Sequence, residues 1–527
     1  MDTTNSLKSL GAKVNTSMEH SQEENADLGL RLRTDSGVYH VNWDTEAAVT
    51  PHGQIAFFAQ YLHTADLFSR WCSDCPLDYV SNNAPEVSDV LGTLLLSVLS
   101  GHTRYNHISS IYGDVVSAQV LGVDKTVSSD SARRALKRMN EASCAQWQQD
   151  HLRKTYESLL TKPYILDIDT SVKPLYGSQE GAVKGYNPKK PGRPSHSYHT
   201  YFVGTLRLVL DVEVHPGNES AALYTRPGFW RLMECLPPNL WPYLIRGDIG
   251  FGNEGMMTEC ENRGRKYLFK LKQTGNVKVL IRQLEGVSGD WSDAGDGWQG
   301  CKAKLKLDGW SKDRQLIVLR RCKRKRGEQK ELVAHSDEQQ QGEFAFVQLV
   351  TNGLEYEYAV LVTNLDAEIL TIAQLYRDRS DCENVFDELK NHWGWAGFTT
   401  QDLKRSQIMA RIIAQAYNWW TVYCRLATPQ KHSEAITSRP MFFETIGRLV
   451  QSAGQRRIRL TSTNQRASQI QEVMTSVSRF LDKLCSTAAQ LTAEQRWAAI
   501  LSRAFAYFLK GNAVEAVSDG RQLLIAF

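Results

Sequence analysis

Three acidic residues that lie far apart in the sequence are the first candidates for chemistry. Asp169 and Asp248 each end a short apolar run, YILDID and LIRGD, of the kind that forms a buried strand. Glu383 lies within residues 366–393, a stretch without glycine or proline that predicts a helix. Carboxylates at two strand ends and on one helix can bind two divalent ions about 4 Å apart, which stabilise the attacking and leaving oxygens of a phosphodiester. These residue types therefore predict metal-dependent phosphoryl transfer.

The segment around Glu383 carries further polar groups at helical spacing. At about 100° per residue, one arc of about 60° holds four of them: Tyr376, Arg379, Glu383 and Lys390. The adjacent face is apolar and predicts contact with the core through Leu375, Val385, Phe386 and Leu389. A carboxylate beside a phenol and two cations suits a site that holds a metal and a phosphodiester together. Spacing alone also fits an ordinary solvated helix with charge pairs, and the two strand acids favour the site.

These segments resemble a bacterial insertion-sequence transposase of the Asp-Asp-Glu (DDE) class. The resemblance is to the group whose third-acid helix carries a Tyr-x2-Arg-x3-Glu-x6-Lys signature, which the four helix residues match without a gap. RGDIGF at residues 246–251 resembles the family's second-Asp motif, and DIDTSV at residues 167–172 resembles its first. The resemblance spans about residues 37–427, and the helix signature is its most specific part.

The resemblance implies that Asp169, Asp248 and Glu383 are both the catalytic residues and the metal ligands. Their carboxylates would hold Mg²⁺, for which Mn²⁺ would substitute, to activate a water or polarise a 3′-hydroxyl. Asp167 is a close alternative to Asp169, because residues two apart in a strand point to the same face. Asp169 is preferred because the family's motif places its acid just before a small hydroxyl-bearing pair, here Thr170-Ser171.

The other signature residues are expected to contact DNA beside the cut. Arg379 and Lys390 would neutralise phosphates, and Tyr376 would hydrogen-bond a phosphate or stack on a displaced base. In relatives the resemblance also implies a hairpin step during excision and a homodimer that pairs two DNA ends. Three tryptophans are candidates for holding a flipped base, although a buried core role is commoner for any one of them: Trp291, Trp298 and Trp310.

Composition sets wide bounds on the class of protein. The 527 residues predict about two to four domains, and 42% hydrophobic with 23% charged residues is ordinary for a soluble globular protein. A net charge of +4 permits nucleic-acid binding without demonstrating it. Ten dispersed cysteines predict a reducing compartment, and Cys72 and Cys75 form a CxxC without a second pair at zinc-ribbon spacing. Without a signal peptide pattern or a run of about 18 apolar residues, a cytoplasmic, nucleoid-associated protein without membrane contact is expected.

The N-terminal part predicts a flexible polar tail, residues 1–35, and then a mostly helical DNA-binding region, residues 36–160. Helices are expected at residues 54–71 and 87–99. Residues 114–139 have a helix-turn-helix outline, with a turn at Gly122 and an N-cap cluster, Ser128-Ser129-Asp130. The second helix carries four candidate DNA-contacting cations, which fit equally a surface helix: Arg133, Arg134, Lys137 and Arg138.

The central part predicts an α/β catalytic core in two pieces, residues 161–272 and 364–427. Strands are expected at residues 164–169, at 199–214 (two strands), at 243–248 and at 266–272, and helices at residues 221–236 and 253–262. This order approximates a ribonuclease H-like fold, which the resemblance also implies, whereas periodicity alone predicts only a mixed α/β class.

Residues 273–363 predict a β-rich insertion that interrupts the core. It holds a hairpin signal, Asn352-Gly353, and the densest basic run, RRCKRKR at residues 320–326. Residues 428–527 predict a helical C-terminal region, expected to bind DNA like the N-terminal one, with scattered cations that include Arg456, Arg457 and Arg459.

The sequence therefore favours a cut-and-paste DNA transposase. Such an enzyme binds the terminal inverted repeats of its element in double-stranded DNA, cuts there and joins the 3′ ends to target DNA. A ribonuclease H-like nuclease without strand transfer and an inert transposase-derived DNA-binding protein are the alternatives, and the presence of all three acids argues against the latter. No GxxxxGK, HExxH or GxSxG motif supports ATP hydrolysis, zinc proteolysis or serine esterase chemistry.

Overall fold

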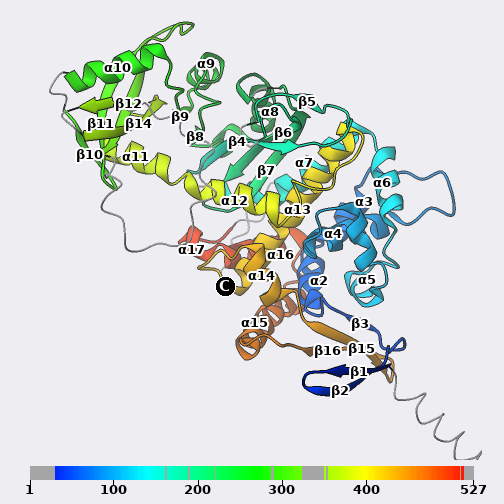
Figure 1. The fold of residues 1–527 in the computed structure, drawn as a ribbon. Coiled ribbons are helices and arrows are strands. Elements are labelled where there is room, and N and C mark those ends of the chain that lie inside the picture. Colours follow the sequence, from blue (N-terminus) through cyan, green and yellow to red (C-terminus); the bar gives the residue numbers. More distant parts are fainter. Residues whose placement is uncertain are drawn as a thin grey trace, which may run out of the picture. The chain divides into compact units, whose positions relative to one another are not determined.

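The computed structural model describes residues 30–160, 163–187, 190–219, 221–286, 290–322, 349–351, 354–510 and 512–514. Most of the predicted tail, the basic run beyond Cys322 and the Asn352-Gly353 turn therefore lie outside the described residues. The chain divides into two compact units, one of Met1–Val49 with Arg448–Arg459 and one of Thr50–Gly447 with Leu460–Phe527 (Figure 1). The fold is mixed α/β, with one large sheet and many helices, as the sequence predicts at class level.

In the described part of the larger unit, eleven strands form one sheet in the order β10-β11-β12-β14-β9-β8-β4-β6-β5, with β7 paired to β6 and β13 to β14. At its centre, β4 is antiparallel to β6 and parallel to β8, and β8 is parallel to β9. The strands are β4 (Ile165–Pro174), β5 (Val183–Lys184), β6 (Pro194–Val203), β7 (Leu208–Pro216), β8 (Leu244–Gly247), β9 (Lys266–Lys270), β10 (Ser292–Gly295), β11 (Trp298–Leu305), β12 (Arg314–Cys322), β13 (Leu349–Thr351) and β14 (Leu354–Thr363).

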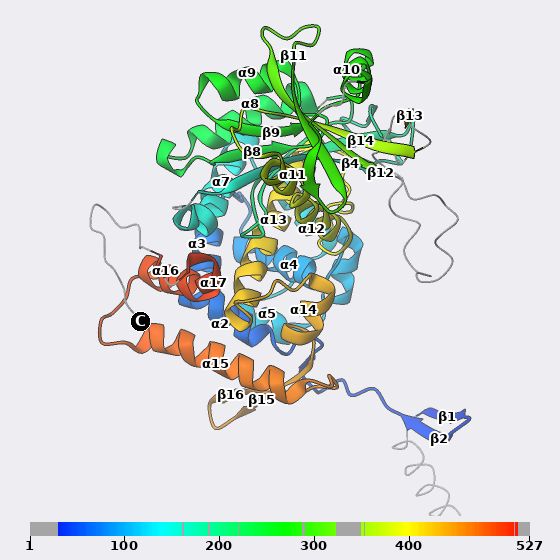
Figure 2. The ribbon, with the colours of Figure 1, turned by 90° about the vertical axis from the view of Figure 1, so that its left-hand side faces the viewer.

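The helices gather around this sheet and below it in Figure 2, where α2, α4, α14, α15 and α16 lie beneath the strands. They are α2 (Ile55–Thr64), α3 (Leu67–Ser73), α4 (Val87–Leu99), α5 (Val115–Leu121), α6 (Ser129–Arg138), α7 (Glu141–Tyr156), α8 (Ala221–Glu234), α9 (Glu254–Asn262), α10 (Gly275–Gly286), α11 (Ile369–Arg377), α12 (Ser380–Asn391), α13 (Leu403–Ala427), α14 (Ala435–Phe442), α15 (Ala467–Ser486), α16 (Ala493–Ala504) and α17 (Ala506–Leu509). Over the residues that the structure describes, none of the helices has the length and apolar character needed to cross a membrane.

The smaller unit contains the hairpin of β1 (Leu30–Thr34) with β2 (Gly37–Val41), paired in antiparallel register. It also contains most of a second hairpin, formed by β15 (Ile446–Ser452) and β16 (Gln455–Thr461). The prediction of helix across this part of the C-terminal region is therefore wrong, because Ala453 and Gly454 adopt positive φ angles of 51° and 73° and turn the chain back on itself.

Local signals predict several helix ends well. Helix α4 has the predicted bounds, residues 87–99, and the two helices of the predicted helix-turn-helix outline are present as α5 and α6. Gly122 ends α5 with a left-handed φ of 82°, and the Ser128 hydroxyl accepts from the backbone N–H of Ser131 to cap α6.

Two predicted helices are interrupted, and one helix was missed. The predicted helix at residues 54–71 is split into α2 and α3 at Asp66, whose φ is 53°. The predicted helix at residues 366–393 is split into α11 and α12 around Asp378 and Arg379. Helix α10 lies inside the insertion, where only strands were expected. The left-handed residue Asp66 interrupts the first helix, whereas Asp378 and Arg379 keep helical angles and form only a turn. Periodicity of apolar residues reveals neither interruption.

Helix α13 covers the free edge of β7 with side-chain amides. Asn418 accepts from the backbone N–H of Val209 at 2.9 Å and donates to its carbonyl at 2.8 Å. Gln407 accepts from the N–H of Val214 at 2.6 Å and donates to the carbonyl of Val212 at 2.9 Å. These amides replace a neighbouring strand, so the sheet edge is closed to pairing with another chain.

A buried lysine ties β4 to the loop after α12. Lys173 donates to the Tyr198 hydroxyl at 3.3 Å and to the carbonyl of Gly397. Burial lowers the pKa of Lys173 to about 7. The ammonium is therefore held in the core largely by neutral acceptors, and its desolvation opposes folding.

We expect Lys173 to make stability rise with pH above neutrality. Its folded pKa of about 7 lies below the unfolded value of about 10.4, so the unfolded chain binds more protons between these values. The free energy of unfolding should rise across this window by up to about 1.4 kcal/mol per pH unit from this group. Lys173→Met should remove that contribution in urea unfolding between pH 7 and 10, whereas Lys302→Met, at an exposed position, should leave the slope unchanged. If wild type, Lys173→Met and Lys302→Met show the same dependence of unfolding free energy on pH, the lowered pKa of Lys173 is contradicted.

Candidate active site

The three predicted acids come from three elements that meet beside the centre of the sheet. Asp169 lies in β4 and Asp248 directly follows β8. These strands are parallel neighbours whose last paired residues are Ile168 and Gly247, so each aspartate follows the same step of the ladder. Glu383 lies in the first turn of α12.

The guanidinium of Arg379 joins two of these acids. It donates from Nη1 to Glu383 Oε1 at 2.6 Å and from Nη2 to Asp169 Oδ1 at 2.7 Å. Arg379 is only 3% exposed. Burial lowers its pKa, but the charges around it more than offset this and hold the pKa well above its usual value; they belong to Asp169, Tyr376, Asp248 and Glu383. Arg379 therefore bonds to two of the acids, and the negative charge of the third, Asp248, also favours its protonated form.

The acids remain open to the surface although Arg379 is not. The side chains of Asp169 and Glu383 are 16% and 57% exposed. Asp248 is partly buried, and its Oδ1 accepts from the N–H of Gly250 at 2.9 Å. A substrate or ion can thus reach the carboxylates from solvent.

Asp167, the alternative to Asp169, is instead fully buried. Its Oδ1 and Oδ2 accept from Arg246 at 2.6 and 2.8 Å, and Oδ2 also accepts from the thiol of Cys382 at 2.8 Å. Arg246 in turn donates to the carbonyl of Leu375 in α11. We call Asp167, Arg246, Cys382 and the Leu375 carbonyl the buried network. Both oxygens of Asp167 are occupied away from solvent, so this carboxylate is closed to a substrate.

Each charged or thiol member of the buried network precedes a candidate acid by one or two residues. Asp167 lies two before Asp169, Arg246 two before Asp248, and Cys382 directly before Glu383. Asp167 and Asp169 share one face of β4, so the buried network lies next to the acids. It joins the three segments that carry them. Sequence reasoning missed this network, although an arginine inside an apolar strand is a signal that a buried partner is needed.

A two-residue turn at Asp378 and Arg379 separates α11 from α12, although both residues keep right-handed helical angles. Arg379 still contacts Glu383 four residues later, as the predicted arc requires. Tyr376 lies near the end of α11, and Lys390 lies near the end of α12 with its Nζ 3.8 Å from Asp387 Oδ1. Arg379 lies at the break and contacts carboxylates rather than facing solvent.

The donor set suits a hard divalent cation, since carboxylate oxygens are the ligands that Mg²⁺ prefers. Within the described ranges, however, no group of three or more Asp, Glu, His or Cys side chains lies close enough together to hold an ion. At the point where the acids converge, Arg379 supplies the positive charge. The three carboxylates are therefore of the type that binds a divalent metal, and in this structure the guanidinium of Arg379 balances their negative charge.

Three of the four predicted cations of α6 line one cavity of about 510 Å³, the α6 cavity. Its lining consists of Asp130, Arg133, Arg134, Lys137, Gln179, Thr399, Thr400, Gln401 and Arg405. Lys404 holds the start of α13 against the end of α6 by donating to the carbonyls of Lys137 and Met139. Arg138 points elsewhere, with its guanidinium 5.9 Å from the ring centre of Tyr79. The cavity thus presents four cations and one acid.

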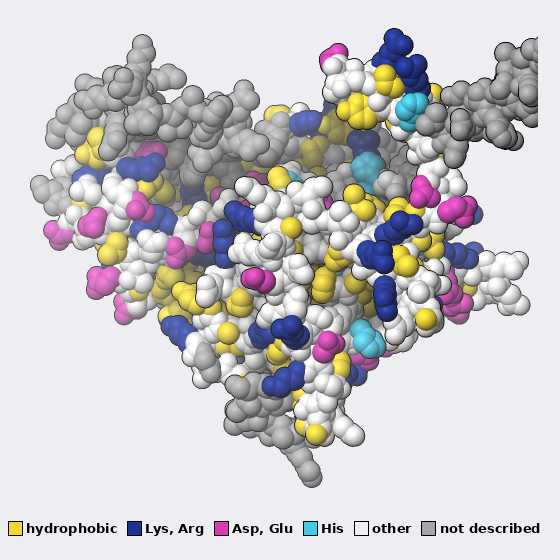
Figure 3. Space-filling view, turned by 90° about the horizontal axis from the view of Figure 1, so that it is seen from below, with side chains coloured by type: hydrophobic (Ala, Val, Ile, Leu, Met, Phe, Trp, Pro, Cys, Tyr) yellow, Lys and Arg dark blue, Asp and Glu magenta, His cyan; other side chains and the backbone are white. Residues whose placement is uncertain are grey.

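Positive charge is not confined to this cavity. On the face drawn in Figure 3, the described Lys and Arg side chains form several separate groups with Asp and Glu between them. This agrees with the small net charge of +4.

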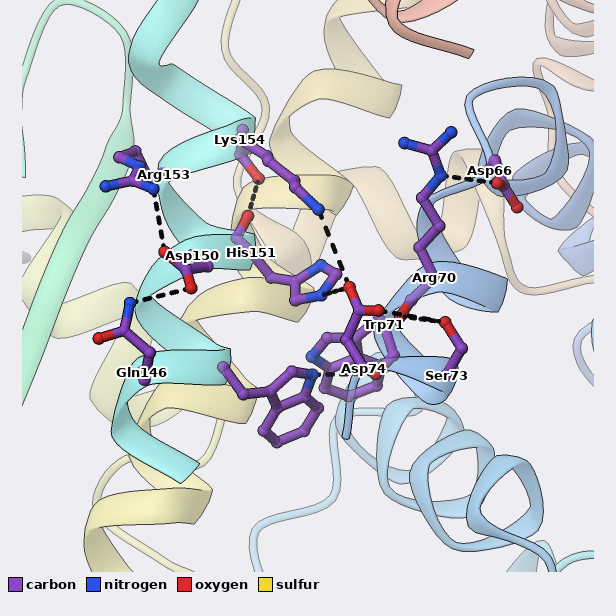
Figure 4. A network of polar contacts seen from close by, with 12 residues as sticks. Asp66, Arg70, Trp71, Ser73, Asp74, Gln146, Asp150, His151, Arg153 and Lys154 are labelled. Carbon is purple, nitrogen blue, oxygen red and sulfur yellow. Dashed lines mark hydrogen bonds and ion pairs between the residues drawn. The ribbon is translucent and has the colours of Figure 1, made fainter. Parts of the chain in front are cut away.

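A second cavity of about 910 Å³ is lined by residues of α3, α7, α13 and α16. Figure 4 shows the polar contacts beside it, in which Lys154 and His151 both face Asp74 at 3.9 and 3.0 Å. Arg153 pairs in the same way with Asp150 at 3.0 Å. Burial lowers the pKa of His151 to about 4. The charge of Lys154 lowers this pKa further, whereas Asp74 opposes the shift. The contacts to Asp74 join α7 to the end of α3, whereas the pair of Arg153 with Asp150 lies within α7.

The three candidate tryptophans each have a guanidinium against the ring. Arg320, Arg321 and Arg314 lie 3.9, 4.9 and 5.2 Å from the ring centres of Trp291, Trp298 and Trp310 respectively. Trp310 is buried, while the other two are partly exposed.

Comparison with known proteins identifies the family. The family described as transposase DDE domain group 1 matches residues 79–481, which is most of the chain. The protein therefore belongs to the DDE transposase family. No curated protein matches the sequence. Among solved structures, it is similar to one described as the cryo-EM structure of the piggyBac transposase synaptic complex with hairpin DNA, at 10% identity over 84% of this chain and 85% of that chain, with a TM-score of 0.36.

We expect the buried network to dominate the stability of the site. Arg246→Ala should lower the free energy of unfolding by about 3–5 kcal/mol, because it leaves the carboxylate of Asp167 buried and unpaired. Arg246→Met combined with Asp167→Leu should recover much of this loss in urea unfolding. Glu234→Ala, which removes an exposed ion pair with Arg263, should cost less than about 1 kcal/mol. If Arg246→Ala is no less stable than Glu234→Ala, the expectation is contradicted.

Proposed function

We propose that this protein is a metal-dependent transposase of the insertion-sequence type that moves its element by cut and paste. It binds the terminal inverted repeats, cuts DNA there and joins the 3′ ends to target DNA. The observation that carries this proposal is that Arg379 bridges Asp169 of β4 and Glu383 of α12, while Asp248 follows β8, the parallel neighbour of β4, at the same step of the ladder. Membership of the DDE transposase family supports it.

The strand order supports a ribonuclease H-like core. Strands β7, β6, β4, β8 and β9 lie in this order, with β6 and β7 antiparallel and β8 parallel to β4. In the proposed organisation, residues 161–272 and 364–427 form this core and residues 273–363 are the insertion. The flanking regions, residues 36–160 and 428–527, bind DNA.

The proposed catalytic residues are Asp169, Asp248 and Glu383, which would hold Mg²⁺ or, in its place, Mn²⁺. When bound, the metal supplies charge neutralisation and activation of the attacking oxygen. The chain's own residues position the groups, since phosphodiester chemistry leaves a protein little covalent work. The buried network ties the two strands and α12 together, which limits how far the three carboxylates must move to share an ion.

DNA contacts are proposed at two places. Tyr376 and Lys390 flank the acids on α11 and α12 and would bind the strand being cut. Arg133, Arg134 and Lys137 would bind backbone phosphates at the α6 cavity, where Arg405 adds a further cation. Arg138 is proposed to contribute less, because its guanidinium lies over Tyr79. A homodimer on paired ends in the nucleoid completes the proposal.

Cleavage should depend on the acids while binding does not. With a labelled fragment carrying the inverted repeats that bracket the reading frame, plasmid and Mg²⁺, Asp248→Ala should reduce cleavage by at least about 100-fold, because a metal ligand is removed. DNA binding should be nearly unchanged by gel shift. Asp381→Ala, at an exposed position of α12, is the matched control and should cleave normally. Equal cleavage by Asp248→Ala would refute the site, and cleavage without joined product would favour a nuclease.

Phosphate binding at the α6 cavity should appear in the salt dependence of DNA affinity. Replacing Arg133, Arg134 and Lys137 by alanine should weaken binding and flatten the plot of log affinity against log salt by about 0.9 for each phosphate that is no longer neutralised. A charge-matched control replaces the exposed Lys302, Lys304 and Lys306 by alanine and should keep the slope. An unchanged slope in the α6 variant would exclude phosphate binding at this cavity.

A further inference from the structure

We propose that Arg379 is a resident counter-ion of the acids, one that leaves them for a DNA phosphate and so makes metal binding depend on DNA. This inference rests on the proposed function and adds to it a regulation of the same site. It concerns what the side chain does before DNA arrives.

The first step is that Arg379 occupies the oxygens that a metal would need. Its two terminal nitrogens contact Asp169 Oδ1 and Glu383 Oε1 at 2.7 and 2.6 Å. These two acids come from the sheet and from α12, so one guanidinium bridges two elements. Charge-assisted bonds of this length hold carboxylates that would otherwise repel each other.

The second step is that Arg379 and a divalent ion compete. An ion on the same carboxylates would place two positive charges beside the guanidinium of Arg379, which is itself only 3% exposed. Like charges at such distances disfavour each other strongly, so each cation weakens the binding of the other. Tight metal binding therefore requires Arg379 to move.

The third step is that Arg379 is placed to move. It lies at the break between α11 and α12, and it makes no side-chain cap to α12. In the part of the chain that the structure describes, its buried Nε has no hydrogen-bond partner. An unsatisfied donor is costly, so the bridged state is incompletely stabilised. A planar guanidinium is also well matched to a phosphate, which offers several acceptor oxygens at once.

The consequence is a reciprocal coupling between two ligands. A DNA phosphate that draws Arg379 away leaves Asp169 and Glu383 free to bind a metal, so DNA raises metal affinity. By linkage, the metal raises DNA affinity by the same factor. The protein would thus hold its catalytic ion tightly only at a DNA end.

The test measures Mn²⁺ binding by the decrease of the free-ion electron paramagnetic resonance signal. The full-length protein is titrated alone and with a duplex of the element end whose 3′ terminus is a dideoxynucleotide, so that no joining occurs. Wild type should bind Mn²⁺ at least about 10-fold more tightly with the duplex, within the usual range of coupling between sites. Arg379→Gln should already bind about 10-fold more tightly without DNA and gain little from it.

Two further variants keep the test decisive. Arg379→Lys retains a charge but not the planar fork, so it should bind Mn²⁺ with intermediate affinity. It replaces Arg379→Gln in the test if that variant folds poorly. Arg377→Gln is the matched control, because Arg377 contacts the Ala294 carbonyl at 2.6 Å and Asp296 at 3.0 Å instead of the three acids. It should bind Mn²⁺ as wild type does.

The outcomes separate this inference from the proposed function. If wild type binds Mn²⁺ and neither Arg379 variant binds it more tightly without DNA, the counter-ion role is overturned and the metal site stands. If no protein binds Mn²⁺ with or without the duplex, or if Asp248→Ala binds it as wild type does, the proposed metal site itself is overturned.

Discussion

The buried ion pair between Asp167 and Arg246 is the constraint on which the site depends. Both side chains have given up their hydration, so neither can part from the other without leaving an uncompensated charge in the core. The thiol of Cys382 and the carbonyl of Leu375 complete the pair's hydrogen bonds and bring in the helices from a distant part of the chain. One set of polar contacts therefore fixes β4, β8 and the α11–α12 segment together.

Exposure increases from this network toward solvent. The network is closed, Arg379 above it is buried between acids, and Asp169 and Glu383 reach the surface. The closed network joins the segments that carry the acids, and the acids themselves are exposed enough to meet a ligand from solvent.

Residues 273–363, the predicted insertion, extend the sheet that carries Asp169. Strand β14 pairs with β9 in antiparallel register, so the insertion strands extend the central sheet. Helix α11 packs with its apolar residues on the same strands, and Arg377 at its end contacts Ala294 and Asp296 near β10. Helix α11 therefore connects these strands to the turn where Arg379 lies, directly before α12.

The sequence by itself determined the features that depend on neighbouring residues. The bounds of α4, the cap at Ser128, the turn at Gly122 and the strands that lead to Asp169 and Asp248 all follow from local conformational preference and apolar spacing. Only the tertiary structure decided which of Asp167 and Asp169 is buried, and where Arg379 points. Both aspartates share one strand face, so the difference between them arises from Arg246, Cys382 and Arg379, which come from elsewhere in the chain. Asp167 is buried by contacts with residues 79 and 215 positions away in the sequence, and no local sequence pattern predicts such contacts.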